Sequence, residues 1–65
     1  MTDFEIASFY LHWVCHAHET LDRKGYVDVV TKIRQTPRFV RLPEIYRGQI
    51  EGFAMGLLAK VEGLV

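Results

Sequence analysis

The stretch PEIYRGQIEGFAMGLLAKVE, residues 43–62, decides the fold because it combines two helical patterns in one segment. Its three glycines, Gly48, Gly52 and Gly56, recur every four residues and therefore share one face of a helix. Other apolar side chains follow steps of three and four on the opposite face: Tyr46, Ile50, Phe53, Ala54 and Leu57. We therefore predict a helix over residues 43–62 that packs on its own chain through one face and offers a smooth second face.

The N-terminal third of the chain predicts a second long helix with a signal at each end. Thr2 and Glu5 have the capping-box spacing, in which each side chain accepts a hydrogen bond from the other residue's amide. Gly25 is placed to end the helix in the left-handed conformation. The residues between them include an apolar series at helical spacing: Ile6, Phe9, Tyr10, Trp13, Val14, Ala17 and Leu21. These signals predict a helix over residues 3–24.

The middle of the chain predicts a shorter helix and a linker. Residues 26–35 fit a helix; their β-branched run also suits a strand, but a lone strand would leave its backbone groups unpaired. Residues 36–42 lie between two X-Pro pairs, and the residue before proline is disfavoured in a helix. Thr36 is placed to cap a short turn with Pro37 at its first position.

The predicted fold is a single all-α domain over residues 1–65. It is a hairpin of two long antiparallel helices, 3–24 and 43–62, with the shorter helix between them. Their apolar stripes are expected to meet around four residues: Phe9, Trp13, Phe53 and Leu57. A chain of 65 residues is near the lower size limit for folding alone, so we also expect a homodimer.

Composition and motifs favour a non-enzymatic cytoplasmic protein. Eight basic and eight acidic residues cancel, so no overall field steers the chain towards nucleic acid or an anionic membrane. The single cysteine, Cys15, fits a reducing compartment, and no secretory signal or long uncharged apolar segment is seen. Phosphate-binding glycine loops, paired Cys-x-x-Cys motifs and catalytic signatures are missing from the sequence, so we expect no enzyme activity and no cofactor.

The three glycines are the first candidate contact. Glycine inside a helix costs roughly 0.5–1 kcal/mol relative to alanine, and this cost indicates that another backbone comes close. The close neighbour is a helix of the same chain, a second copy of the chain or a foreign partner. For a dimer, the candidate contact residues are Gly48, Gly52, Gly56 and Ala59, with Leu11 and Cys15 as the complementary surface.

One strip of the first helix carries residue types that ligate zinc. His12, Cys15, His16 and Glu19 follow the spacing i, i+3, i+4 and i+7, which places them on one side of the helix. A single helix rarely completes a tetrahedral shell, and the rest of the chain has no other zinc-binding motif. We therefore predict no metal site and interpret the strip as a solvated polar face; a metal shared by two copies is the alternative.

The basic segment 32–47 is the candidate partner-binding surface. It contains an aromatic residue between arginines, and arginine and aromatic side chains are enriched at interface hot spots. The candidate contacts are Arg34, Arg38, Phe39, Arg41 and Arg47. A protein partner and a nucleic acid are both open; the further alternative is a solvated loop whose Phe39 and Leu42 pack in the core.

The chain resembles the short accessory proteins encoded by bacteriophages and prophages in its length, acidic start, basic middle and capped helices. Its segment from Tyr46 to Phe53, YRGQIEGF, is similar in style to the C-terminal helices of such proteins. The resemblance implies a protein that binds and inhibits or redirects a bacterial protein, such as a transcription factor or a defence complex. We therefore expect a small protein-binding module; a nucleic-acid-binding regulator and a metal-binding helical protein are the alternatives.

Overall fold

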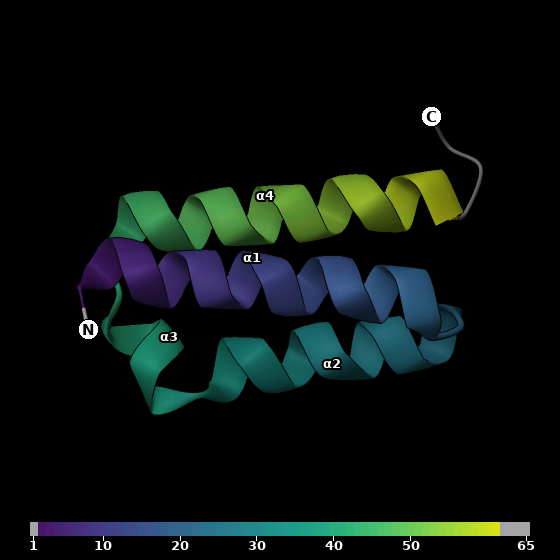
Figure 1. The fold of residues 1–65 in the computed structure, drawn as a ribbon, viewed down its shortest axis with the longest axis horizontal. Helices are drawn as coiled ribbons and strands as arrows, with labels where there is room; N and C mark the ends of the chain where they lie inside the picture. The colour runs from purple at the N-terminus through teal and green to yellow at the C-terminus, as the bar shows by residue number, and fades with distance from the viewer. Residues whose placement is uncertain (1, 62–65) are drawn as a thin grey trace.

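The computed structural model describes residues 2–61, and this part of the chain contains helices and no strand (Figure 1). The helices are α1 (Asp3–Thr20), α2 (Arg23–Gln35), α3 (Pro37–Arg41) and α4 (Glu44–Val61). The predicted all-α class is confirmed. Residue 62, where the sequence predicts that the last helix ends, lies outside the described residues.

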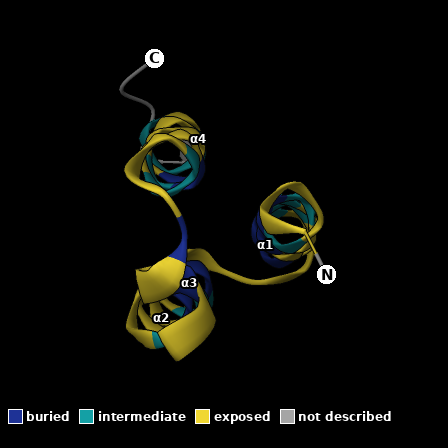
Figure 2. Cartoon of the chain, turned by 90° about the vertical axis from the view of Figure 1, so that its left-hand side faces the viewer, coloured by how far each residue is buried: buried dark blue, intermediate teal, exposed yellow. Residues whose placement is uncertain are grey.

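The three long helices are placed side by side with α3 at one end. Figure 1 shows α1 and α4 running in the same direction and α2 running back between them in the chain. The prediction that the first and last helices are antiparallel is therefore wrong. The chain reverses its direction after α1 and again between α2 and α4, so α4 runs the same way as α1. Viewed from the end, α1, α2 and α4 stand at the corners of a triangle (Figure 2).

The start of α1 confirms the predicted capping box, but its end differs. The Glu5 amide donates to the Thr2 hydroxyl at 3.1 Å, and the Thr2 amide donates to the Glu5 carboxylate at 3.1 Å. The helix ends at Thr20 rather than at residue 24. The reason is Asp22, whose carboxylate accepts from the Gly25 amide at 2.8 Å and thereby caps α2. Gly25 therefore lies in the first turn of α2, and its predicted role as the end of α1 is wrong.

The predicted linker 36–42 contains the short helix α3. Thr36 caps it and Pro37 occupies its first turn, as the sequence predicts for this turn. The Thr36 hydroxyl donates to the Ile33 carbonyl at 2.8 Å and accepts from the Phe39 amide at 3.3 Å. The Tyr10 hydroxyl lies 2.8 Å from the same oxygen, so one threonine connects α1 to the joint between α2 and α3.

The core lies between the three long helices and is closed at one end by α3. Its buried members are Ala7, Tyr10, Val14, Ala17, Tyr26, Ile33, Phe39, Leu42, Ile50 and Ala54. The expectation that the helices meet around Phe9, Trp13 and Phe53 is wrong, because these side chains are 57%, 37% and 40% exposed. Apolar side chains cover much of the circumference of α1, so their spacing fits more than one buried face. The face that is buried contains two alanines, whose small side chains let the neighbouring helices approach closely.

The last helix begins directly after Pro43, whose carbonyl accepts from the amides of Tyr46 and Arg47 at 3.0 and 3.1 Å. Ile50 and Ala54 of α4 are buried, and Leu57 packs half-buried against them. In the part of the chain that the structure describes, no helix combines the length and the apolar character that crossing a membrane requires.

Candidate functional site

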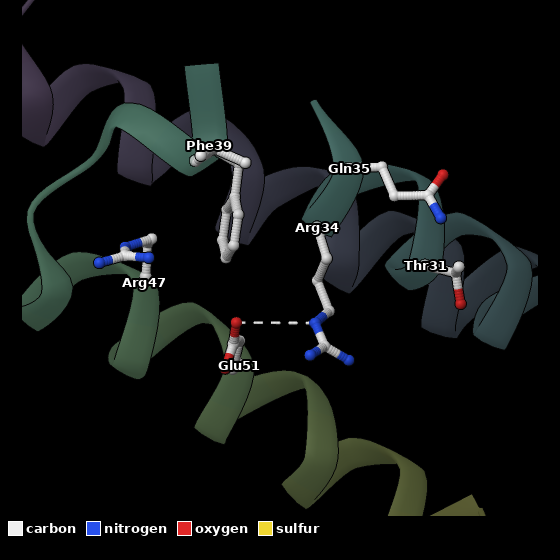
Figure 3. Close-up of a pocket in the computed structure, with 7 residues that line it drawn as sticks. Thr31, Arg34, Gln35, Phe39, Arg47 and Glu51 are labelled. Carbon is white, nitrogen blue, oxygen red and sulfur yellow. Dashed lines mark ion pairs between the residues drawn. The ribbon is translucent and has the colours of Figure 1, made fainter. Parts of the chain in front are cut away.

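A cavity of about 340 Å³ lies where α2, α3 and α4 meet (Figure 3). Polar side chains from α2 and α4 form most of its wall, and α3 adds two apolar ones. The lining residues are Thr31, Arg34, Gln35, Phe39, Val40, Arg47 and Glu51. Two guanidinium groups and one carboxylate therefore surround the same space.

The ion pair between Arg34 and Glu51 joins α2 to α4 at this cavity. Nε of Arg34 lies 3.6 Å from Oε1 of Glu51, and the side chains are 59% and 43% exposed (Figure 3). The separation is longer than a hydrogen bond, and exposed pairs of this kind contribute little to stability. The Arg34 guanidinium is therefore held near the cavity while most of its hydrogen-bonding capacity remains available.

Arg47 lines the cavity from the first turns of α4, and in Figure 3 its guanidinium lies on the side of the Phe39 ring that faces away from Arg34. Its Nε atom is buried, and within the described residues it has no hydrogen-bond partner. A buried donor without a partner costs about 1–3 kcal/mol, because the water that it loses on folding is not replaced. Among the described residues that line the cavity, Arg47 is the one with a buried side-chain donor that lacks an acceptor.

The basic segment does not form one continuous contact surface. Arg34 and Arg47 share the cavity, whereas Arg38 lines a different hollow of about 100 Å³ with three residues of α1. Arg41 is exposed in the last turn of α3. Phe39 is only 3% exposed, and its ring packs edge-on against Tyr10 with the centroids 5.9 Å apart.

Phe39 is therefore a core residue, and its predicted place in an exposed contact is corrected. Leu42 is buried as well, at 3% exposed. Both outcomes match the alternative in which these two side chains pack inside. Arg38 and Phe39 are neighbours in sequence, but in a helix their side chains point to different sides. The two residues of α3 therefore do not form one contact surface.

The glycines of α4 face away from the rest of the described chain. A Cβ atom built on Gly48, Gly52 or Gly56 would find nothing within 4 Å outside its own helix. Packing of this stripe against another helix of the same described chain is thus excluded. The exposed side of α4 also carries Ile45 and Met55, which are 68% and 60% exposed. We call this side the glycine face; its members are Ile45, Gly48, Gly52, Met55, Gly56 and Ala59.

The two residues predicted to complement the glycines lie in a shallow apolar groove between α1 and α4. Leu11 and Cys15 are both half-buried and line this groove of about 330 Å³. His12, Gln49 and Phe53 complete its wall. The groove is formed within one chain, so Leu11 and Cys15 are already in part covered by α4.

A second apolar area on α1 is formed by Phe9 and Trp13, whose rings pack edge-on at 6.1 Å. His12 and His16 border the hollow beside them. The sequence pattern assigns these two aromatic residues to the core, so an exposed position for them was not predicted. Phe4, at the start of the same helix, is 67% exposed.

The zinc-ligand strip of α1 remains on the surface. His12, His16 and Glu19 are exposed, and Cys15 is half-buried in the groove between α1 and α4. Among the described residues, no three His, Cys, Asp or Glu side chains come together in a way that could hold a metal ion. The strip is thus a row of separate polar side chains in the described structure.

Four cavity residues were not among the predicted contacts: Thr31, Gln35, Val40 and Glu51. Thr31 and Gln35 lie near the C-terminal end of α2, and Glu51 lies one turn after Arg47 on α4. A sequence signal for Glu51 exists only in part, since its spacing of four from Arg47 places both on one side of a helix. The approach of Glu51 to Arg34 depends on how α2 packs against α4.

Comparisons of the chain with protein-family models, curated proteins and solved structures find no match.

Proposed function

We propose that the protein is a small non-catalytic protein-binding module that acts as a homodimer. The observation that carries this proposal is the glycine face of α4, which has no partner within the described chain. The face contains no charged residue between Ile45 and Ala59, and its two large side chains are mostly exposed. Exposed continuous apolar surfaces of this kind mark interaction sites. The sequence leaves a foreign protein open as the other possible partner of the glycine face. The arrangement of residues on this face favours a second copy of the chain.

The glycine face is self-complementary when two copies pack antiparallel about Gly52. Gly48 and Gly56 are each four residues from this centre, so each glycine of one copy opposes a glycine of the other. Ile45 and Ala59 are each seven residues away, which places a large side chain against a small one. A two-fold axis requires matching of this kind, because one surface must fit itself.

Charges at the ends of α4 favour the antiparallel arrangement over the parallel one. Glu44 and Lys60 are each eight residues from Gly52 and both are exposed. Antiparallel packing places the Glu44 end of one copy at the level of the Lys60 end of the other, on the two edges of the contact. Parallel packing would place like charges and like ends of the helix dipole together.

The aromatic surface of α1 is separate from the glycine face and stays accessible in such a dimer. Phe9 and Trp13 provide the large side chains that commonly anchor protein interfaces. The partner is a macromolecule other than the chain itself, and the resemblance to phage-encoded accessory proteins implies a bacterial protein that is inhibited or redirected. Nucleic acid is less well supported, because Arg34 and Arg38 line different hollows rather than one basic surface.

Light scattering tests the dimer directly. The wild-type chain at micromolar concentration is expected to show twice the 7.6 kDa mass of one chain. Gly52→Leu is expected to give the mass of one chain with an unchanged helical circular dichroism spectrum. Lys32→Leu is the matched control, because it adds the same side chain to an exposed helical position on α2. A wild-type mass of one chain, or a dimeric Gly52→Leu variant, would overturn the proposed dimer.

Partner binding requires a second measurement. A protein that is retained by the immobilised wild-type chain should be lost with the double variant Phe9→Ser, Trp13→Ser. It should be retained by Lys32→Leu at the wild-type level. Equal retention by the aromatic variant would contradict the assignment of this surface.

A further inference from the structure

The apolar groove between α1 and α4 lies directly beside the glycine face. Gln49 and Phe53 form its wall on α4, and α1 forms the other wall. Phe53 follows Gly52 in the sequence, and successive side chains of a helix point about 100° apart, so the Phe53 ring lies at the border of the glycine face. This ring is 40% exposed. Packing within the described chain therefore leaves part of its apolar surface uncovered.

The two borders of the glycine face differ in chemistry. Gln49 and Phe53 are on the side of α4 that faces α1, as their place in the groove shows. Glu51 and Met55 are on the side that faces α2, since both line a hollow with two residues of α2. The first side thus presents an amide and an aromatic ring. The second side presents a methionine and a carboxylate, which lies 3.6 Å from Arg34.

The two-fold axis of a dimer determines which of these sides adjoin. In an antiparallel pair the axis is perpendicular to the helices, so the side that faces α1 in one copy adjoins the same side of the other. In a parallel pair the axis runs along the helices, and unlike sides adjoin. Antiparallel packing about Gly52 therefore brings the two Phe53 rings to one side, about 3 Å apart along the helix direction. Gln49 of each copy lies at the same offset from Phe53 of the other.

We propose that each Phe53 ring packs on Phe53 and Gln49 of a second copy, at the mouth of the groove between α1 and α4. The proposal rests on the proposed dimer and names the residues that complete its contact beside the glycine face. Covering the exposed part of the ring is favourable, because apolar surface is removed from water. Two aromatic rings that pack edge-on or offset gain further stability.

The charges on the other side of α4 favour the same arrangement. The two Glu51 carboxylates adjoin there, but each is paired with Arg34 of its own copy, so the four charges sum to zero. Parallel packing would instead place a Phe53 ring beside the Glu51 carboxylate of the other copy. That contact would remove water from a charge without supplying a hydrogen-bond donor. A second copy in the antiparallel arrangement therefore suits both sides of the helix.

Isotope-filtered nuclear magnetic resonance on the wild-type chain tests the contact. The sample contains equal amounts of isotope-labelled and unlabelled chain, and the filter records only nuclear Overhauser effects between copies. We expect cross-peaks between the Phe53 ring protons of one copy and the Gln49 side-chain amide protons of the other. Met55 is the matched control, because it lies as far after Gly52 as Gln49 lies before it. Cross-peaks from Phe53 to the Met55 methyl group would indicate the parallel arrangement and overturn the proposal.

A substitution measures how much the ring contributes. Phe53→Ser should raise the dissociation constant of the dimer at least about tenfold, since both copies lose the covered ring. Phe9→Ser makes the same change at a residue of α1 that is 57% exposed and lies away from the glycine face, so it should leave the constant unchanged. Analytical ultracentrifugation measures both variants, and circular dichroism shows whether they keep their helices. Equal weakening by the two substitutions would overturn the proposal.

The outcomes separate this contact from the dimer itself. A wild-type mass of one chain in light scattering would overturn both. A dimeric wild-type chain without cross-peaks between Phe53 and Gln49 would overturn the Phe53 contact and leave the dimer through the glycine face intact. Because the nuclear magnetic resonance measurement uses the wild-type chain, it gives this answer even if Phe53→Ser unfolds.

Discussion

The phenolic hydroxyl of Tyr26 donates a hydrogen bond to the backbone carbonyl of Ala54 at 2.7 Å in the interior of the protein. The bond crosses from α2 to α4, and both residues are 2% exposed. Tyr10 makes the corresponding connection from α1 to Thr36, at the joint of α2 and α3. An otherwise apolar core is thus crossed by two tyrosines whose hydroxyl groups connect the helices to one another.

Removing the Tyr26 hydroxyl should lower stability without unfolding the protein. Tyr26→Phe keeps the ring and loses one buried hydrogen bond, so we expect the free energy of unfolding to fall by about 1 kcal/mol. In a domain of this size such a loss lowers Tm by roughly 4–8 °C. Thermal and urea unfolding followed by circular dichroism measure it. Tyr46→Phe, at a half-buried position on α4, is the control, and equal effects of the two substitutions would contradict the special role of Tyr26.

The same residue should make the protein less stable in alkaline solution. Burial raises the pKa of Tyr26 above its ordinary 10.0, and the negative charge of the Cys15 thiolate adds to the effect. The unfolded chain therefore releases this proton at lower pH than the folded one. The contribution of Tyr26 is complete below pH 10 and is lost as the pH rises through the higher folded pKa.

Urea unfolding at about pH 9 and about pH 11 measures this contribution. The wild-type chain should lose more stability between these two values than Tyr26→Phe does. Tyr10 and Tyr46 are present in both proteins, so the difference isolates Tyr26. Parallel losses in both proteins would show that Tyr26 does not titrate differently on folding.

Local signals in the sequence were sufficient to predict the helices and several of their ends. The capping box of Thr2 and Glu5 and the Thr36-Pro37 start were predicted because each depends on residues three or four apart in the chain. The end of α1 was missed, since two signals compete at residues 22–25. Gly25 can end a helix, but Asp22 caps the next one, and the second signal includes a hydrogen bond that needs Gly25 inside α2.

The buried face of α1 and the direction of α4 could not be predicted in the same way. Apolar residues on α1 leave several faces possible, and packing against the other helices buries the face with Tyr10 and Val14. The cavity depends on the same packing. Arg34 and Arg47 were predicted as contacts from charge alone, while Glu51 enters only because α2 lies beside α4.

Alanine should have different effects at Gly48 and Gly25. A Cβ atom at Gly48 meets nothing within 4 Å, so Gly48→Ala should stabilise the folded monomer by about 0.5–1 kcal/mol through helix propensity. At Gly25 the same atom would lie 3.2 Å from both the Asp22 carboxylate and the Leu21 Cβ. The carboxylate is held by the capping hydrogen bond, so we expect Gly25→Ala to gain nothing or to destabilise.

Both substitutions are best compared in the Gly52→Leu background, where a contact between copies does not contribute. Urea unfolding then reports the monomer alone. If Gly25→Ala raised the free energy of unfolding as much as Gly48→Ala does, the cap at Asp22 would adapt freely to the added methyl group. A destabilising Gly48→Ala would show that the glycine face is covered within the chain.

Phe39 should behave as a core residue rather than as a contact. Phe39→Ala removes a ring that is 3% exposed and packs against Tyr10, and such truncations cost about 3–5 kcal/mol. A domain of this size has roughly that much stability in total, so the variant should lose its helical circular dichroism signal at 37 °C or below. Phe39→Leu keeps most of the volume and should remain folded with a lowered Tm. Arg41→Gln, on the same short helix, should change Tm by little, since its side chain is exposed. A folded Phe39→Ala variant with an unchanged Tm would contradict the core position. Removing a buried ring of this size leaves a cavity or makes the surrounding side chains move into the space, and both lower stability.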